Sequence, residues 1–191
     1  MKNVFLVLII LSIPLSFFSQ NLIEKNFPTK DGKIHYTDVV NVDSSLTPSD
    51  LYLNAKTWLV DAFKSSKAVI QTDDKEAKLI IVKSYIPIGH NSFVSNPKKW
   101  FVLKIEMKES RYRYALYDIW YEGTVSLMGH TAKIDKSFEE WMKSSGGKYS
   151  ERKQQKYEDA MTDYCKELDT EFRNIISSLE IGMNKVKNDD W

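Results

Sequence analysis

Alternating apolar and polar residues between positions 99 and 122 predict two antiparallel strands joined by a tight turn. If Glu109 and Ser110 form the turn, the facing positions of one phase are all apolar or aromatic. One face of the hairpin is therefore predicted to be buried, because side chains two residues apart share a face. The other face is charged, and it sets Glu106 opposite Arg113 as a favourable cross-strand pair. The apolar pairs are Met107 with Tyr112, Ile105 with Tyr114, and Leu103 with Leu116.

Three segments before the hairpin also have the pattern of β-strands. The charged residues at positions 73–76 separate the second segment from the third. They are interpreted as a solvated turn, because they lack the ligand spacing of a calcium-binding loop. After Leu116 the alternation of the hairpin fails, which predicts a bulge or the end of the sheet near Asp118. The three segments are residues 33–42, 68–72 and 78–86.

Two segments lack a regular pattern and are expected to be irregular. The first, residues 87–99, precedes the hairpin. The second, residues 123–147, contains one short helical run at 137–143 with a small apolar face. Long irregular segments in a compact domain often carry function, so the second segment is the place to expect a site. Its apolar face consists of Phe138, Trp141 and Met142.

Two helices are predicted from apolar residues spaced three and four apart. The first begins at Thr47, which can cap it, with Pro48 in the first turn, and it ends near residues 65–66. The second runs from Ser150 to about Lys185 and carries an apolar stripe along one side. The stripe could form a coiled coil between two chains. Packing on the sheet is preferred, because the sheet otherwise has an uncovered apolar face.

The first nineteen residues have the features of a secretory signal. Lys2 is followed by an apolar run at residues 4–13, which Pro14 interrupts. The run is shorter than the roughly 20 apolar residues of a membrane-spanning helix. Cleavage after Ser19 would leave a mature domain of residues 20–191, and a retained membrane anchor is the alternative. Because no cysteine lies near the junction, we expect a periplasmic, extracellular or envelope-associated protein that is not a lipoprotein.

The composition gives little support for catalysis. The chain has 27 basic and 26 acidic side chains, so it has no electrostatic reason to bind nucleic acid. The single cysteine, Cys165, flanks the apolar stripe of the second helix and is predicted to be an inert buried thiol rather than a reactive one. His35, His90 and His130 lack neighbouring ligands at metal-binding spacing. We expect no cofactor, no metal and no enzyme, the alternative being a hydrolase that uses isolated groups such as His130 or the carboxylates of residues 73–74.

The expected order of elements is strand, helix, four strands and a long helix. Together with four stretches of sequence, it resembles a family of secreted bacterial domains of unknown function with a TBP-like fold, over residues 27–120. The resemblance implies an α+β domain of the helix-grip type, with a curved antiparallel sheet in the order β-α-β-β-β-β-α. It implies no activity, cofactor or catalytic residue. The stretches are FPTKDGKIHYTDVVNVD, LYLNAKTWL, FKSSKAVIQTDDKEAKLI and KIEMKESRYRYALYDI.

These observations favour a non-catalytic binding or interaction module of the cell envelope. We expect a single monomeric domain with residues 123–150 inserted before the final helix. A structural role in an envelope assembly is the alternative. If the short helix is exposed, its aromatic and Met side chains can form a patch for a partner protein or for a small apolar, lipid-like or glycan ligand. If they are buried, the helix is a plug that closes the sheet. The candidate patch is Trp120, Phe138, Trp141 and Met142.

Overall fold

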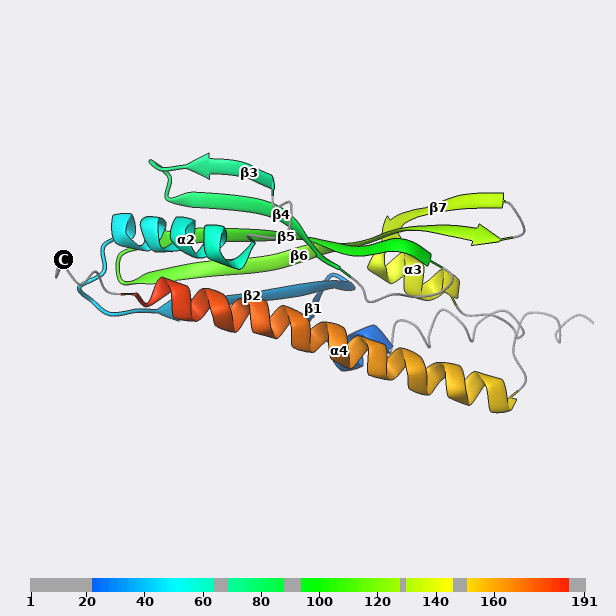
Figure 1. The fold of residues 1–191 in the computed structure, drawn as a ribbon. Coiled ribbons are helices and arrows are strands. Elements are labelled where there is room, and N and C mark those ends of the chain that lie inside the picture. The colour runs from blue at the N-terminus through cyan, green and yellow to red at the C-terminus, as the bar shows by residue number, and fades with distance from the viewer. Residues whose placement is uncertain (1–21, 64–68, 88–93, 128–129, 146–150, 186–191) are drawn as a thin grey trace, which may run out of the picture.

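A curved antiparallel sheet of seven strands forms the centre of the molecule, and a long helix lies along it (Figure 1). The computed structural model describes residues 22–63, 69–87, 94–127, 130–145 and 151–185. The strand order is β1-β2-β6-β5-β4-β3, with β7 paired to the far end of β6. The strands are β1 (Thr29–Lys30), β2 (Lys33–Asn41), β3 (Val69–Asp74), β4 (Leu79–Pro87), β5 (Val94–Lys108), β6 (Arg111–Leu127) and β7 (His130–Ser137), and the helices are α2 (Pro48–Ala62), α3 (Phe138–Ser145) and α4 (Glu151–Met183).

The hairpin of β5 and β6 has the predicted register. Lys108 lies opposite Arg111 across the turn, and Ser110 has a φ of 55°. All three predicted apolar pairs are Cα partners, and their side chains are buried. The hydrophobic pattern therefore determined both the pairing and the buried face of this hairpin.

A β-bulge interrupts β6 where the alternation fails. Tyr117 pairs with Val102 and Trp120 pairs with Trp100, so two residues of β6 oppose one residue of β5. Asp118, one of these two, has a φ of 55°. The extra residue shifts the alternation of β6 by one position, so that Ile119 faces the core while Trp120 faces the other side. The predicted bulge is confirmed.

The two segments predicted to be irregular are mostly strand. Strand β6 continues to Leu127, and β7 folds back on it as a second hairpin before α3 begins. Strand β5 likewise begins at Val94, well before the predicted start, and residues 88–93 lie outside the described part of the chain. The prediction of an irregular region was wrong here because β7 is exposed along most of its length and has no hydrophobic alternation to mark it.

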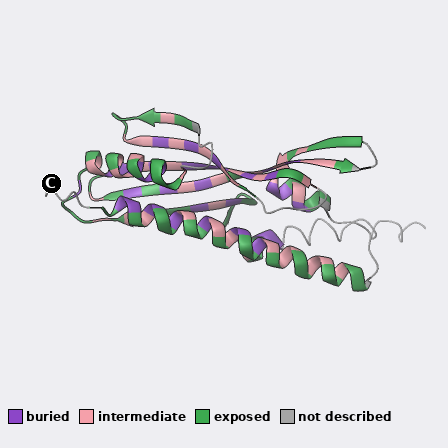
Figure 2. Ribbon diagram, viewed as in Figure 1, coloured by how far each residue is buried: buried purple, intermediate pink, exposed green. Residues whose placement is uncertain are grey.

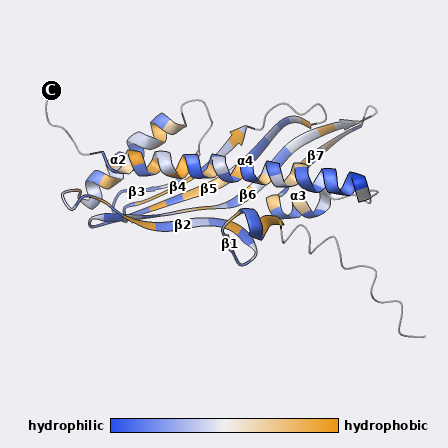
Figure 3. Cartoon of the chain, turned by 90° about the horizontal axis from the view of Figure 1, so that it is seen from below, coloured by the Kyte–Doolittle hydropathy of each residue, from blue (hydrophilic) through white to orange (hydrophobic). Residues whose placement is uncertain are grey.

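Helices α2 and α4 cover one face of the sheet, where they enclose the hydrophobic core (Figures 2 and 3). Thr47 caps α2, since its side chain accepts a hydrogen bond from the backbone N–H of Asp50. Phe172 of α4 packs edge-on against Phe101 of β5, with ring centres 5.8 Å apart. Packing within one chain thus accounts for the apolar stripe of α4, as predicted. Among the described helices, none is long and apolar enough to cross a membrane.

Candidate binding groove on the outer face of the sheet

The sheet has two unlike faces. The inner face contacts α2, α3 and α4 through buried apolar side chains. The outer face, which is formed by the alternate residues of the same strands, is not covered by any helix in the described ranges. Its side chains are a mixture of charged, aromatic, aliphatic and small residues, and most are partly or fully exposed. Any ligand that binds the sheet directly must therefore bind this outer face.

A groove of about 620 Å³ lies on the outer face where β5 and β6 meet β3, β4 and β7. Two tryptophans form its apolar part, and the remaining side chains are polar or charged. The size falls within the range of ligand pockets in proteins. We call it the aromatic groove, and it is lined by Gln71, Lys83, Trp100, Asp118, Trp120, Glu122 and Asp135.

Hydrogen bonds hold both indole rings of the groove. Trp100 and Trp120 are Cα partners across β5 and β6. The indole N–H of Trp100 donates to Glu122 Oε2 at 2.8 Å, and the indole N–H of Trp120 donates to Asp135 Oδ1. Both rings are thereby fixed by their polar edges, so that little side-chain entropy remains to be lost when a ligand packs against them.

Charges of both signs surround the two indoles. Lys83 Nζ and Lys98 Nζ each lie 5.6 Å from the centre of the Trp100 ring. Hydrogen bonds from Lys133 and Trp120 lower the pKa of the Asp135 carboxyl, which is therefore ionised at neutral pH. The groove can thus both donate and accept hydrogen bonds beside an apolar surface.

The structure separates the four residues of the predicted patch. Phe138 and Met142 are buried, and Trp141 stacks on Tyr121 with ring centres 4.6 Å apart. All three belong to α3, which closes the inner face at one end of the sheet. Trp120 follows the opposite phase of β6 and lies in the aromatic groove. The predicted patch therefore does not exist as one surface, because neighbouring residues of a strand point to opposite faces.

The alternation of the hairpin is sufficient to place Trp100 on the outer face, although Trp100 was not among the predicted patch residues. Trp100 shares the phase of Lys104 and Glu106, which had been assigned to the charged outer face of the hairpin. The same alternation places an indole on that face. The carboxylates of the groove come from β6 and β7, and their proximity depends on a strand pair that the sequence did not reveal.

The isolated polar groups considered as catalytic candidates remain apart. Asp73 is the penultimate residue of β3, where it accepts hydrogen bonds from Tyr52 and Lys56. His35 stacks on Tyr117 at 5.6 Å, and His130 is exposed at the start of β7. His90 lies outside the described residues. Within the described part of the chain, no group of three His, Cys, Asp or Glu side chains is arranged to hold a metal ion.

Comparison with known proteins identifies the fold. A family model described as a domain of unknown function (DUF4468) with TBP-like fold matches residues 36–122. The crystal structure of a DUF4468 family protein from Bacteroides ovatus ATCC 8483 is similar, with 13% identity, a TM-score of 0.52, and coverage of 88% of this chain and 96% of that chain. A TBP-like protein from Parabacteroides distasonis ATCC 8503 is also similar, with 13% identity, a TM-score of 0.50, and coverage of 81% of this chain and 97% of that chain. Among curated proteins, none matches.

Proposed function

We propose a function from the site itself, because a fold alone does not specify an activity. The family model that matches residues 36–122 describes a domain of unknown function with TBP-like fold. We propose that this protein is an exported, non-catalytic binding module of the cell envelope that binds glycans in the aromatic groove. The observation that carries the proposal is the cross-strand pair Trp100 and Trp120, whose indole N–H groups are anchored by carboxylates on the outer face of the sheet.

The chemistry of the groove favours a glycan over other small ligands. A sugar ring presents a flat C–H face beside hydroxyl groups that both donate and accept hydrogen bonds. The indole rings can pack against the C–H face of the sugar, and the polar side chains around them can hydrogen-bond to its hydroxyl groups. Gln71 and Lys83 can donate to sugar hydroxyls, while Asp118 can accept from them. A purely apolar ligand would leave these polar groups without partners, which is costly in a closed contact.

The residues of the groove support binding rather than turnover. Two of its carboxylates, Glu122 and Asp135, are already engaged by indole N–H groups and by lysines. A glycosidase needs one carboxyl group that is held protonated and a second that stays ionised. The pKa of Asp135 is lowered, which is the wrong direction for a general acid.

The proposal is tested by titrating the mature protein with a panel of neutral and amino-sugar oligosaccharides in a calorimeter. We expect binding that Trp100→Ala and Trp120→Ala each weaken about tenfold or more, as for a buried anchor of an interface. Trp141→Phe is the matched control, because that indole lies on the inner face and its replacement should leave the affinity unchanged.

Two outcomes would contradict parts of this proposal. If no oligosaccharide binds, or if the groove variants bind as well as wild type, the glycan assignment is wrong. Release of new reducing ends from any member of the panel would show turnover and would overturn the non-catalytic role.

A further inference from the structure

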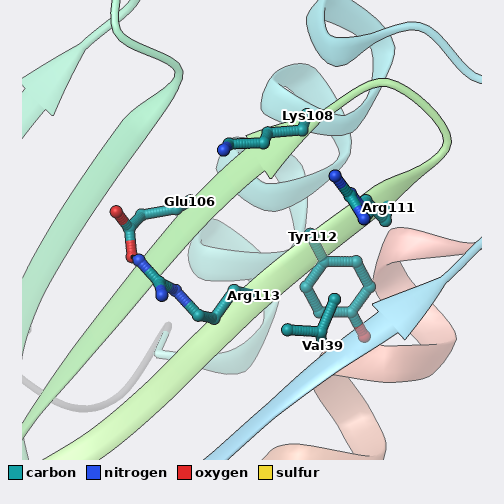
Figure 4. Close-up of a pocket in the computed structure, with 6 residues that line it drawn as sticks. All are labelled: Val39, Glu106, Lys108, Arg111, Tyr112 and Arg113. Carbon is teal, nitrogen blue, oxygen red and sulfur yellow. Dashed lines mark hydrogen bonds and ion pairs between the residues drawn. The ribbon is translucent and has the colours of Figure 1, made fainter.

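The turn of the β5–β6 hairpin carries a concentration of positive charge on the outer face. Four basic side chains and one carboxylate share this surface. Figure 4 shows Lys108, Arg111, Arg113 and the carboxylate of Glu106. The chain as a whole has a net charge of only +1, so the local excess is not a consequence of composition. We call this surface the basic tip, and it comprises Lys104, Glu106, Lys108, Arg111 and Arg113.

A single carboxylate cannot neutralise the basic tip. Arg113 binds Glu106 Oε2 through Nε at 3.0 Å and Nη2 at 2.7 Å. Lys104 approaches the other oxygen of Glu106 at 3.2 Å. Both oxygens are therefore engaged. Lys108 and Arg111 have no ion-pair partner among the described residues, and the exposed Glu109 of the turn pairs with neither.

The two unpaired cations stand directly opposite each other. Lys108 and Arg111 are Cα partners at the last pair before the turn. Like charges in facing positions of an antiparallel pair destabilise the sheet. An anion placed between the two side chains would convert this repulsion into two attractions.

The basic tip is also concave. A pocket of about 300 Å³ opens beside Lys108 and Arg111, with Val39 of β2 as its apolar wall (Figure 4). This volume is at the lower end of the range for ligand pockets, which suits one polar group of a ligand rather than a whole large molecule. Glu106 and Arg113 line the same pocket.

We propose that the basic tip binds the phosphate group of a ligand. A phosphate presents several acceptor oxygens and up to two charges, so it can receive the guanidinium of Arg111 and the ammonium of Lys108 together. The two oxygens of a carboxylate can both be bound by the guanidinium of Arg111, which would leave Lys108 without a partner. The phosphate can belong to a soluble phosphorylated sugar or to a lipid headgroup, and the geometry of the tip suits either. This site is separate from the aromatic groove and does not depend on its function.

The proposal is tested with the mature protein and a double variant, Lys108→Gln with Arg111→Gln. The matched control is Arg152→Gln with Lys153→Gln, which removes the same two charge types from exposed positions of α4 at the far end of the molecule. The soluble probes are inorganic phosphate and glucose 1-phosphate, and their binding is measured from the side-chain Nε–H NMR signals of the arginines. The lipid probes are vesicles of phosphatidylglycerol, with phosphatidylcholine vesicles for comparison, and their binding is measured by sedimentation. All titrations are made at constant ionic strength with chloride as the reference.

We expect wild type and the control variant to bind the probes with the same affinity. The tip variant should bind at least about tenfold more weakly, since two charge-assisted contacts are lost. Loss with the soluble probes assigns a soluble phosphorylated ligand, and loss with phosphatidylglycerol vesicles alone assigns a lipid headgroup. Equal weakening of both variants would show non-specific attraction and would overturn the proposal. Absence of binding to every probe would overturn it as well.

Discussion

Lys99 is a buried cation on the apolar face of the sheet. Only 4% of the residue is exposed. Its Nζ lies 3.8 Å from Glu171 Oε2 of α4 and 4.4 Å from the centre of the Tyr164 ring. Burial lowers the pKa of the Lys99 ammonium, against the opposing attraction of Glu171. The folded protein therefore incurs a cost for holding this charge, which the nearby carboxylate and ring offset only in part.

We predict that Lys99→Met raises the free energy of unfolding by about 1 kcal/mol at pH 7, because an apolar side chain of similar length replaces a desolvated charge. The partner Glu171 is not left as a buried charge, since its side chain is 43% exposed and water can solvate it. The folded pKa of Lys99 lies below its unfolded value of 10.5, so between the two values the folded state binds fewer protons and wild type gains stability as pH rises. The advantage of the variant should shrink over that range. Urea unfolding at several pH values measures it, and a lower stability at pH 7 would show that the pair with Glu171 is net stabilising.

At the scale of single residues, the sequence predicted which face of an element a side chain occupies. It did not predict which side chains from distant elements contact it there. Cys165 illustrates this: it was expected to be buried and inert, and burial raises the pKa of its thiol to about 12. Lys99 shows the limit of the same reasoning. Its phase places it on the inner face, but its partners Tyr164 and Glu171 lie on a helix far along the chain, which no local pattern can bring to it.

The close approach of α2 and α4 depends on Gly182. A Cβ atom at this position would lie 2.8 Å from three atoms of the Trp58 side chain. The Trp58 ring is itself fixed, because its Nε1–H donates to Ser178 Oγ at 2.8 Å. The two helices can therefore make room for a methyl group only by moving apart.

We predict that Gly182→Ala lowers the free energy of unfolding by about 1 kcal/mol. Alanine favours a helix over glycine by about 1 kcal/mol, but overpacking against a rigid ring costs about 1–3 kcal/mol, and the second effect is expected to prevail. Thermal and urea unfolding measure the difference. Ser177→Ala, at an exposed position of the same helix, is the control. A stabilised Gly182→Ala protein would mean that the Trp58 ring gives way easily.

Elements with one strongly apolar face could be predicted, and elements without one could not. Helix α2, the hairpin of β5 and β6 and the long helix α4 each carry such a face, and each was placed within a few residues. Strand β7 has exposed side chains along most of its length and is defined instead by backbone pairing with β6. The aromatic groove was missed for the same reason, since Asp135 reaches Trp120 only through this pairing.

At the scale of the whole molecule, the outer face carries two different surfaces at the two ends of one hairpin. Lys108 of the basic tip lies eight positions after Trp100 of the aromatic groove along β5, which corresponds to about 27 Å of extended strand. A single small ligand cannot span both. The two sites therefore act independently unless the ligand is a chain of several sugars.

Export is the prediction that concerns the whole chain, and it depends on Lys2, the apolar run after it and Pro14. Protein recovered from the envelope should have an intact mass that lacks about the first nineteen residues of the sequence. The mass is measured on material from separated cytoplasmic and envelope fractions. Full-length protein found in the cytoplasm would contradict the prediction.

The bulge in β6 allows the strand to lose one residue without exchanging its buried and exposed faces. Asp118 is the surplus residue of this strand, so loss of its codon would leave Tyr117 outward and Ile119 inward, as they are now. Such a deletion would remove the local bend and one acidic wall of the groove while the core kept its contacts. Related chains could therefore reshape the ligand surface through a single-codon insertion or deletion, without a compensating change in the interior.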